Sequence, residues 1–385
     1  MRELSGIVDH RFEPLAEILQ GQLESGYDLG ASLAVAVDGQ IVVDCWGGWA
    51  DEGATEPWHS DTITNVWSTT KTMTALCALV LVDRGALDPS EKVATYWPEF
   101  AANGKQDIEV RHVMAHTSGV SAWEQPVTVD DILDDERGTA MLARQAPWWP
   151  PGTASGYHLG NWGHLVGEIV RRIDGRGLKV FFAEEVAGPL GADFAIGAPE
   201  SEHGRISPVI PPPSRPLPDD LDPETVLAKS LTGPRVDLSV ANTAAWRNAT
   251  IGAANGHGNA RSVATIQAAV SNHGRVGEVR LMAADTVDRI FERPFFGEDL
   301  VLGESVAWGL GFALGHAAEP GGLTSDRVCF WTGGGGSFVV NDLANRVTVA
   351  YAMNRMHSPS ATRSAMFAAL GSILEWPDRT AGDHD

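Results

Sequence analysis

The strand-like segments of this chain lie near its two ends, and that placement limits the fold more than any other feature of the sequence. Near the N-terminus two apolar runs, 31–37 and 41–46, flank Asp38-Gly39, a dipeptide typical of a β-hairpin. Three further strands are predicted near the C-terminus, at 328–331, 337–341 and 347–353. Strands paired by so short a turn favour an antiparallel sheet. The positions of these strands along the chain predict one sheet built from the two terminal regions, with a helical region inserted between the two sets of strands.

Helix-like segments fill much of the chain between these strands and also follow the last strand. The predicted helices lie at 10–24, 69–84, 159–173 and 360–375, with two more within 259–293. The proline-rich stretch 198–235 has no clear periodicity, so we expect a long ordered loop there. We therefore expect an α+β fold in which residues 1–95 and 256–385 form an α/β domain. Residues 96–255 are expected to form a mostly helical domain with long loops.

The tetrapeptide Ser68-Thr69-Thr70-Lys71 opens a helix that is predicted to be largely buried. Residues three apart on a helix share a face, so the hydroxyl and the amine can touch. A serine hydroxyl is a poor nucleophile until a neighbour takes its proton, and a lysine kept neutral by burial can do so. The same residues also fit a serine cap followed by a lysine that extends to solvent. The motif alone leaves both interpretations open.

Two other segments carry candidate chemistry. Tyr157 follows a Pro-Gly turn, and a tyrosine that shares a proton with a lysine can accept and return that proton. A buried structural tyrosine is the alternative. Four glycines follow Trp331-Thr332 within strand-like sequence, which indicates close approach of a ligand or of another backbone segment. A backbone N–H there could bind an oxyanion, and the alternative is an irregular strand or loose turn.

In their order and spacing these three signals resemble the serine β-lactamase and penicillin-binding protein superfamily, whose signatures include S-x-x-K and K-T-G. The resemblance extends to the His-Thr-Ser-Gly at 116–119 and the Trp-Gly-Leu-Gly-Phe at 308–312, and covers the chain from about residue 10 to 375. Within the superfamily the chain is similar to class C β-lactamases and, more closely, to family VIII carboxylesterases. The resemblance implies a β-lactamase-like fold: an antiparallel sheet flanked by helices, a mostly helical second domain and an active site between them.

The resemblance also implies roles for individual residues. Ser68 matches the acylated serine, Lys71 the lysine base and Tyr157 the tyrosine that shares proton transfer. Which of Lys71 and Tyr157 takes the first proton stays open. The backbone N–H groups of Ser68 and Gly334 match the oxyanion hole.

Two departures from the superfamily pattern concern substrate binding. Where β-lactamases have Tyr-x-Asn, this chain has Tyr157-His158-Leu159, so a leucine stands in place of the amide-binding asparagine. Where they have Lys-Thr-Gly, this chain has Trp331-Thr332-Gly333, with an apolar ring in place of a cation. The residues expected to contact the substrate are Leu159, Trp331, Thr332 and Gly333. Both departures favour small neutral esters over β-lactams.

Composition narrows the partners and the compartment. The formal net charge of −22 argues against binding to nucleic acid. No run approaches the roughly 20 apolar residues that cross a bilayer, and the N-terminus has no apolar core of a secretory signal. Three scattered cysteines, Cys45, Cys77 and Cys329, argue against a disulfide framework or a zinc site. We expect a cytoplasmic protein that needs no metal or cofactor. The oligomeric state stays open.

Other hydrolase motifs are missing from the sequence. There is no G-x-S-x-G elbow, which disfavours an α/β-hydrolase, and no glutamate follows His112 to make H-E-x-x-H with His116. We expect these two histidines to be structural. We predict a serine carboxylesterase that hydrolyses small neutral esters through an acyl-serine intermediate. The alternatives are a β-lactamase, D-amino-acid peptidase, amide hydrolase or acyltransferase on the same fold, or a catalytically silent binding module.

Overall fold

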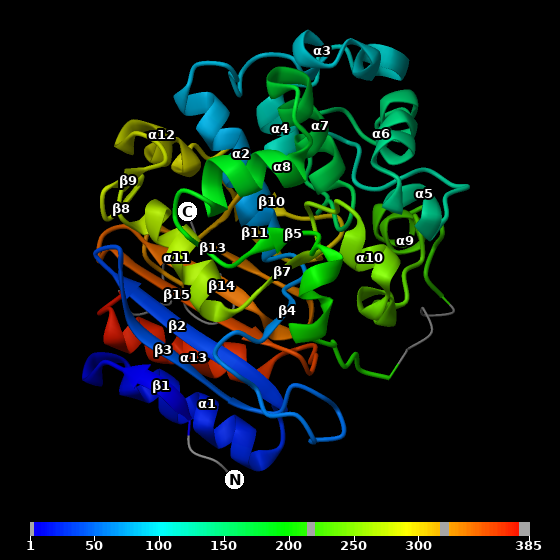
Figure 1. Ribbon diagram of the computed structural model, residues 1–385. Helices are drawn as coiled ribbons and strands as arrows, with labels where there is room; N and C mark the ends of the chain where they lie inside the picture. Colours follow the sequence, from blue (N-terminus) through cyan, green and yellow to red (C-terminus); the bar gives the residue numbers. More distant parts are fainter. Residues whose placement is uncertain (1–3, 214–219, 316–322, 377–385) are drawn as a thin grey trace.

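The computed structural model describes residues 4–213, 220–315 and 323–376 of the chain. Its main element is a nine-stranded sheet in the order β1-β3-β2-β15-β14-β13-β12-β11-β10, in which every neighbouring pair is antiparallel (Figure 1). The strands are β1 (Ser5–Val8), β2 (Gly30–Val37), β3 (Gln40–Gly48), β10 (Phe295–Glu298), β11 (Ser305–Trp308), β12 (Ala313–Leu314), β13 (Val328–Thr332), β14 (Phe338–Asp342) and β15 (Val347–Met353). The prediction of one antiparallel sheet built from both termini is confirmed.

The two ends of the chain meet where β15 pairs with β2. Residues 347–353 run opposite residues 31–37 in antiparallel register. Nearly every residue of both strands is buried, as their continuous apolar sequences indicate for strands covered on two faces. The hairpin between β2 and β3 is also confirmed. Asp38 and Gly39 have φ angles of 52° and 77°, and two positive φ angles are what a type I′ turn requires.

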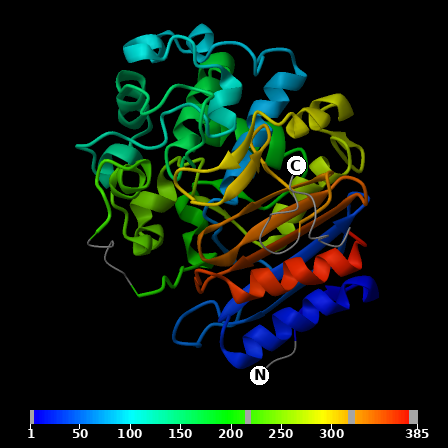
Figure 2. The ribbon, with the colours of Figure 1, turned by 180° about the vertical axis from the view of Figure 1, so that it is seen from behind.

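Helices cover both faces of this sheet. Helices α1 (Glu13–Ser25) and α13 (Ala361–Ile373) lie side by side on one face (Figure 2), and α11 (Ala260–Ser271) packs on the other. Helix α1 buries Leu15, Leu19 and Leu23, because residues four apart project from the same side of a helix. Burial of each such side chain contributes about 1.5–3 kcal/mol to the free energy of unfolding.

The remaining α-helices lie mostly on the side of the molecule away from α1 and α13 (Figure 1). They are α2 (Thr70–Asp83), α3 (Val93–Tyr96), α4 (Val110–Met114), α5 (Val129–Leu133), α6 (Asp135–Arg144), α7 (Trp162–Asp174), α8 (Leu178–Phe182), α9 (Val226–Thr232), α10 (Ala244–Asn248) and α12 (Ala284–Asp288). In the described ranges, no helix combines the length and the apolar character needed to cross a bilayer.

Two smaller sheets complete the fold. One has the order β5-β7-β4-β6, and the other is a two-stranded hairpin. Their strands are β5 (Ala195–Ile196), β7 (Gly256–Gly258), β4 (Ile63–Asn65), β6 (Ile206–Ser207), β8 (Arg275–Val276) and β9 (Val279–Arg280). The four-stranded sheet matters for function because β4 leads directly into the Ser68 turn.

The expectation of a long loop over 198–235 is wrong in part. This stretch contains β6 and the helix α9, whose N-terminus is capped by Thr225. A helix of seven residues is too short to show a clear period in sequence. Pro216 and Pro218, which also supported the loop, lie outside the described residues.

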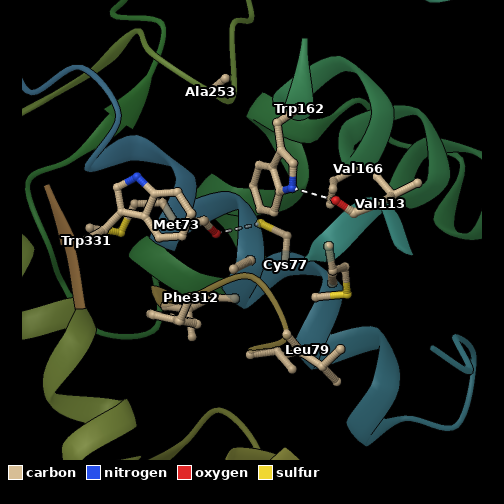
Figure 3. Close-up of a cluster of buried hydrophobic side chains, with 14 of the residues drawn as sticks. Met73, Cys77, Leu79, Val113, Trp162, Val166, Ala253, Phe312 and Trp331 are labelled. Carbon is tan, nitrogen blue, oxygen red and sulfur yellow. Dashed lines mark hydrogen bonds between the residues drawn. The ribbon is translucent and has the colours of Figure 1, made fainter. Parts of the chain in front are cut away.

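Helix α2 forms the centre of the core between the sheet and the helical cluster. The first 13 of its 14 residues are buried, so no face of this helix is exposed to solvent. In Figure 3, Met73 and Cys77 of α2 are surrounded by apolar side chains from other parts of the chain, including Phe312, Trp162 of α7 and Trp331 of β13. A helix buried all round is a rigid base for a side chain at its start.

Candidate active site

Ser68 lies in a tight turn between β4 and α2. Trp67, just before it, has a φ of 49°, a left-handed conformation that is unusual for a bulky residue. The N–H of Lys71 donates to the carbonyl of Ser68 at 2.9 Å, which begins the helix. The N-cap residue is Thr69, and no side chain caps the helix. The interpretation of Ser68 as a helix cap is therefore wrong.

Lys71 is fully buried and its amine faces Ser68. The Nζ atom lies 3.2 Å from Ser68 Oγ, and it donates to the carbonyl of Leu159 at 3.0 Å and to that of Ala253 at 3.1 Å. The alternative of a lysine that extends to solvent is thus also wrong. Burial holds the pKa of the Lys71 amine well below its usual value. Burial thus favours a neutral amine, whose two N–H groups can bond the carbonyls of Leu159 and Ala253 while its lone pair accepts the proton of the serine hydroxyl.

Tyr157 also contacts this hydroxyl. Its phenol oxygen is hydrogen-bonded to Ser68 and accepts a hydrogen bond from Trp331 Nε1 at 3.3 Å. Its ring centroid is 4.8 Å from Lys71 Nζ. Burial raises the pKa of Tyr157 to about 12, although its hydrogen bonds to Ser68 and Trp331 act in the opposite direction. The phenol is therefore protonated at neutral pH.

The glycine-rich turn after β13 packs directly on the Ser68 turn. Ser337 Oγ donates to the carbonyl of Val66 at 2.8 Å and lies 3.1 Å from Thr69 Oγ1. A Cβ atom on Gly333 would lie 2.1 Å from Ser337 Oγ and 2.4 Å from the Val66 carbonyl, so only glycine fits there. Gly334 follows and is exposed.

The amides assigned to the oxyanion hole lie at these two adjoining turns. Across the described parts of the chain, neither the N–H of Ser68 nor that of Gly334 donates a hydrogen bond. Free N–H groups beside a nucleophile are the donors that an oxyanion needs. The serine, the amine, the phenol and two free amides therefore form one cluster, which could carry out acyl transfer.

Comparison with known proteins identifies the family of this chain. The family model described as Beta-lactamase matches residues 15–372. The chain belongs to the Beta-lactamase family.

Individual relatives cover nearly the whole chain. It is 31% identical over 374 residues to "Esterase/beta-lactamase LipL" of Mycobacterium tuberculosis, an alignment of 93% of this chain and 84% of that protein. The solved structure titled "Crystal structure of a family VIII carboxylesterase" superposes with a TM-score of 0.90 at 36% identity, covering 97% of this chain and 100% of the other. A penicillin-binding protein homologue from Caulobacter crescentus superposes with a TM-score of 0.88 at 32% identity, with the same coverage. The β-lactamase-like fold is thereby confirmed.

Within this family fold, the residues that depart from the β-lactamase motifs lie close to the cluster. Trp331 is only 3% exposed, stacks on Trp308 with 5.4 Å between ring centroids, and donates to the phenol of Tyr157. Leu159 is partly exposed and its carbonyl accepts from Lys71. Thr332 ends β13 and is partly exposed. That these residues contact a substrate stays a prediction.

Two buried side chains beside Tyr157 were not predicted to belong to the site. Asp299 accepts the backbone N–H of Tyr157 at 3.0 Å. The ring of His116, which was expected to be structural, lies 5.0 Å from the Tyr157 ring, centroid to centroid. Burial lowers the pKa of His116 well below its usual value, so the ring is neutral. No local motif marks either contact, because the partners come together only in the fold.

A separate cavity lies away from this cluster. Its volume is about 640 Å³, it lies between α6 and α7, and its walls include His164, Glu168 and Arg171. None of the predicted site residues lines it. Searched over the described residues, the structure holds no group of three or more His, Cys, Asp or Glu side chains that could bind a metal ion.

Proposed function

We propose that this chain is a serine carboxylesterase that hydrolyses small neutral esters through an acyl-serine intermediate. The observation that carries the proposal is the contact between Lys71 Nζ and Ser68 Oγ at 3.2 Å, made by an amine with no exposure to solvent. A nucleophile held against a deprotonated base is the central requirement of such an enzyme.

In the acylation step Ser68 Oγ attacks the ester carbonyl carbon and its proton passes to the neutral amine of Lys71. The carbonyl oxygen becomes an oxyanion, which the N–H groups of Ser68 and Gly334 stabilise. When the bond between carbon and leaving oxygen breaks, Tyr157 gives its phenol proton to that oxygen. Lys71 then returns the proton to Tyr157, so the alcohol leaves neutral and both residues regain their starting states.

In the deacylation step water takes the place of the alcohol. Its oxygen attacks the acyl carbon and its proton is taken up by the same pair of residues. Ser68 recovers a proton as the acid leaves. The raised pKa of Tyr157, about 12, suits an acid that protonates an alkoxide. The lowered pKa of Lys71 suits the first base, which supports Lys71 over Tyr157 for the step that the sequence left open.

The substrate class rests on the two motif departures. A tryptophan at position 331 supplies no cation for a substrate carboxylate, and Leu159 supplies no side-chain amide. Relatives support the same class: "Esterase EstB" of Burkholderia gladioli is 32% identical over 192 residues, and LipL is named an esterase as well as a β-lactamase. The name of LipL keeps β-lactam hydrolysis as the second candidate.

The test combines active-site labelling with a substrate series. A fluorophosphonate probe should label the wild type and leave Ser68→Ala unlabelled, while Ser201→Ala, which removes an exposed serine, labels normally. p-Nitrophenyl esters of increasing acyl length, with nitrocefin and an anilide alongside, then rank the substrate classes. Labelling of Ser68→Ala at the wild-type level would refute the proposed nucleophile. Absence of labelling and turnover in the wild type would favour a silent binding module.

We also propose a cytoplasmic location and the division into an α/β domain (1–95 and 256–385) and a helical domain (96–255). The location is supported by Cys45, Cys77 and Cys329, all of which are buried free thiols. The division is supported by the composition of the main sheet, whose strands come only from the first and last of these ranges.

A further inference from the structure

The segment that carries Tyr157 lies outside any helix or strand, so its backbone groups need other partners. The N–H of Gly156 donates to the carbonyl of His116 at 3.1 Å. Ser121 Oγ donates to the carbonyls of Gly156 and Tyr157 at 3.1 and 3.2 Å. The N–H of His158 donates to His116 Nδ1 at 3.1 Å. This segment is thus held by side chains from other parts of the fold.

The backbone N–H of Tyr157 itself donates to the side chain of Asp299. That side chain is fully buried, and Oδ1 accepts the N–H groups of Tyr157, Val301 and Leu302 at 3.0, 2.9 and 3.0 Å. Oδ2 accepts the hydroxyl of Ser155 at 2.5 Å. Four donors around a buried carboxylate satisfy its charge, and hydrogen bonds to an ionised acceptor are stronger than neutral ones.

The carboxylate ties the Tyr157 segment to the loop between β10 and β11. The N–H of Leu300 in that loop donates to the carbonyl of Ser155 at 2.8 Å. Trp308 Nε1 of β11 donates to Ser155 Oγ at 2.7 Å, and its ring lies 15° from parallel to the Tyr157 ring with 6.0 Å between centroids. Asp299 is therefore the junction between this loop and the phenol-bearing segment.

We propose that Asp299 is a positioning residue, which fixes the backbone of Tyr157 so that the phenol meets the leaving oxygen of the ester. This inference rests on the proposed function, in which Tyr157 carries that proton. None of the hydrogen bonds of Asp299 is to Ser68 or Lys71, so these bonds act through the segment that they hold, and the negative charge of Asp299 also helps to raise the pKa of Tyr157. Without the carboxylate the amide of Tyr157 loses its acceptor, and displacement of a reacting group by about 1 Å can cost about 10²-fold in rate.

The experiment measures kcat and KM for an ethyl ester and for the matching p-nitrophenyl ester. The proteins are the wild type, Asp299→Ala, Asp299→Asn, Tyr157→Phe and the double variant Asp299→Ala/Tyr157→Phe. Asp28→Asn is the matched control, because Asp28 is also a buried acceptor of several hydrogen bonds, in its case from the hydroxyls of Tyr351 and Thr362. Melting temperatures are recorded for all variants. Fluorophosphonate labelling reports separately on Ser68.

We expect Asp299→Ala to lower kcat for the ethyl ester about 10²-fold, with labelling of Ser68 retained. Asp299→Asn should recover most of this loss, because its amide oxygen can still accept the N–H of Tyr157. The double variant should be no slower than Tyr157→Phe, since both changes disable one proton transfer. The control Asp28→Asn should keep the wild-type kcat.

Several results would overturn the inference. Losses that multiply in the double variant would show that Asp299 acts independently of Tyr157. A wild-type kcat for Asp299→Ala beside an impaired Tyr157→Phe would refute Asp299 and leave the proposed function standing. A wild-type kcat for Tyr157→Phe would refute both. If Asp299→Ala does not fold, Ser155→Ala takes its place, because it removes one hydrogen-bond donor of the same carboxylate. Ser155→Ala should lower kcat for the ethyl ester by a smaller factor, and it should cause no further loss when combined with Tyr157→Phe. A further loss in that combination would overturn the inference.

Discussion

Replacement of Tyr157 by phenylalanine tests the proton-transfer step most directly. The change removes one oxygen and keeps the ring that packs against His116 and Trp308. It leaves the indole N–H of Trp331 without its acceptor, but that bond is long, at 3.3 Å. We therefore expect a loss of only about 1 kcal/mol in the free energy of unfolding.

The expected loss in rate depends on the leaving group. An alkoxide leaves poorly without a proton, so Tyr157→Phe should slow hydrolysis of an ethyl ester by about 10²- to 10⁴-fold, or roughly 2.7–5.5 kcal/mol. p-Nitrophenoxide leaves readily as the anion. For that ester the same variant should lose far less. The ratio of the two losses isolates the role of the phenol as an acid.

The assay compares kcat/KM for both esters in the wild type, Tyr157→Phe and Tyr96→Phe. Tyr96 is the control, since its phenol accepts a backbone N–H from Asp88 near the surface and should be dispensable for turnover. Equal losses for the two esters would show that Tyr157 positions the site without acting as an acid. Unchanged rates for both would remove it from the mechanism.

Three further predictions follow from other contacts. The proposed base is neutral Lys71, whose pKa is lowered by burial, so kcat/KM should rise as the pH passes through that lowered pKa. It should then stay level, because Tyr157, with a pKa of about 12, stays protonated. A decline in the pH–rate profile well below pH 12 would contradict this. Gly333→Ala places a Cβ 2.1 Å from the side-chain oxygen of Ser337, so it should lower the free energy of unfolding, measured in urea, by about 1–3 kcal/mol or more. Gly204→Ala is the control and should cause no such loss, because no atom lies within 4 Å of its new Cβ. Because position 331 carries a tryptophan and no cation, nitrocefin should be cleaved about 10- to 150-fold less efficiently than p-nitrophenyl acetate. This factor corresponds to the loss of one charge-assisted hydrogen bond of roughly 1.5–3 kcal/mol. Equal efficiencies would refute the preference for esters.

The parts of the fold that the sequence predicted are those whose local pattern is decisive. β2 and β15 are continuous apolar runs, and the Asp38-Gly39 turn permits little besides a hairpin. The edge strand β10 was missed because it has four residues, includes Gly297 and alternates between partly buried and exposed. An edge strand takes much of its stability from its neighbour, here β11, so its own sequence carries little signal.

The candidate site divides in the same way. Ser68 and Lys71 were predicted because their contact spans one helical turn, and local spacing is visible in sequence. Asp299 was missed because it meets the amide of Tyr157 across 142 residues of chain. Its segment, Glu298-Asp299-Leu300, has no motif, and an aspartate in a loop most often lies at the surface. Only the pairing of distant segments shows that the carboxylate is buried.

Trp331 links substrate preference to proton transfer in the proposed mechanism. A lysine at this position would bring a positive charge to the phenol that the indole N–H now contacts. A nearby cation stabilises a tyrosinate and lowers its pKa, and it also opposes a proton on a neighbouring amine. With an indole there, burial prevails and raises the pKa of Tyr157 to about 12. The replacement that removes a binding site for a substrate carboxylate therefore also keeps Tyr157 protonated, as the acid of the proposed mechanism. Because the two effects share one side chain, a change of substrate class at this position should be accompanied by a change in the pH–rate profile.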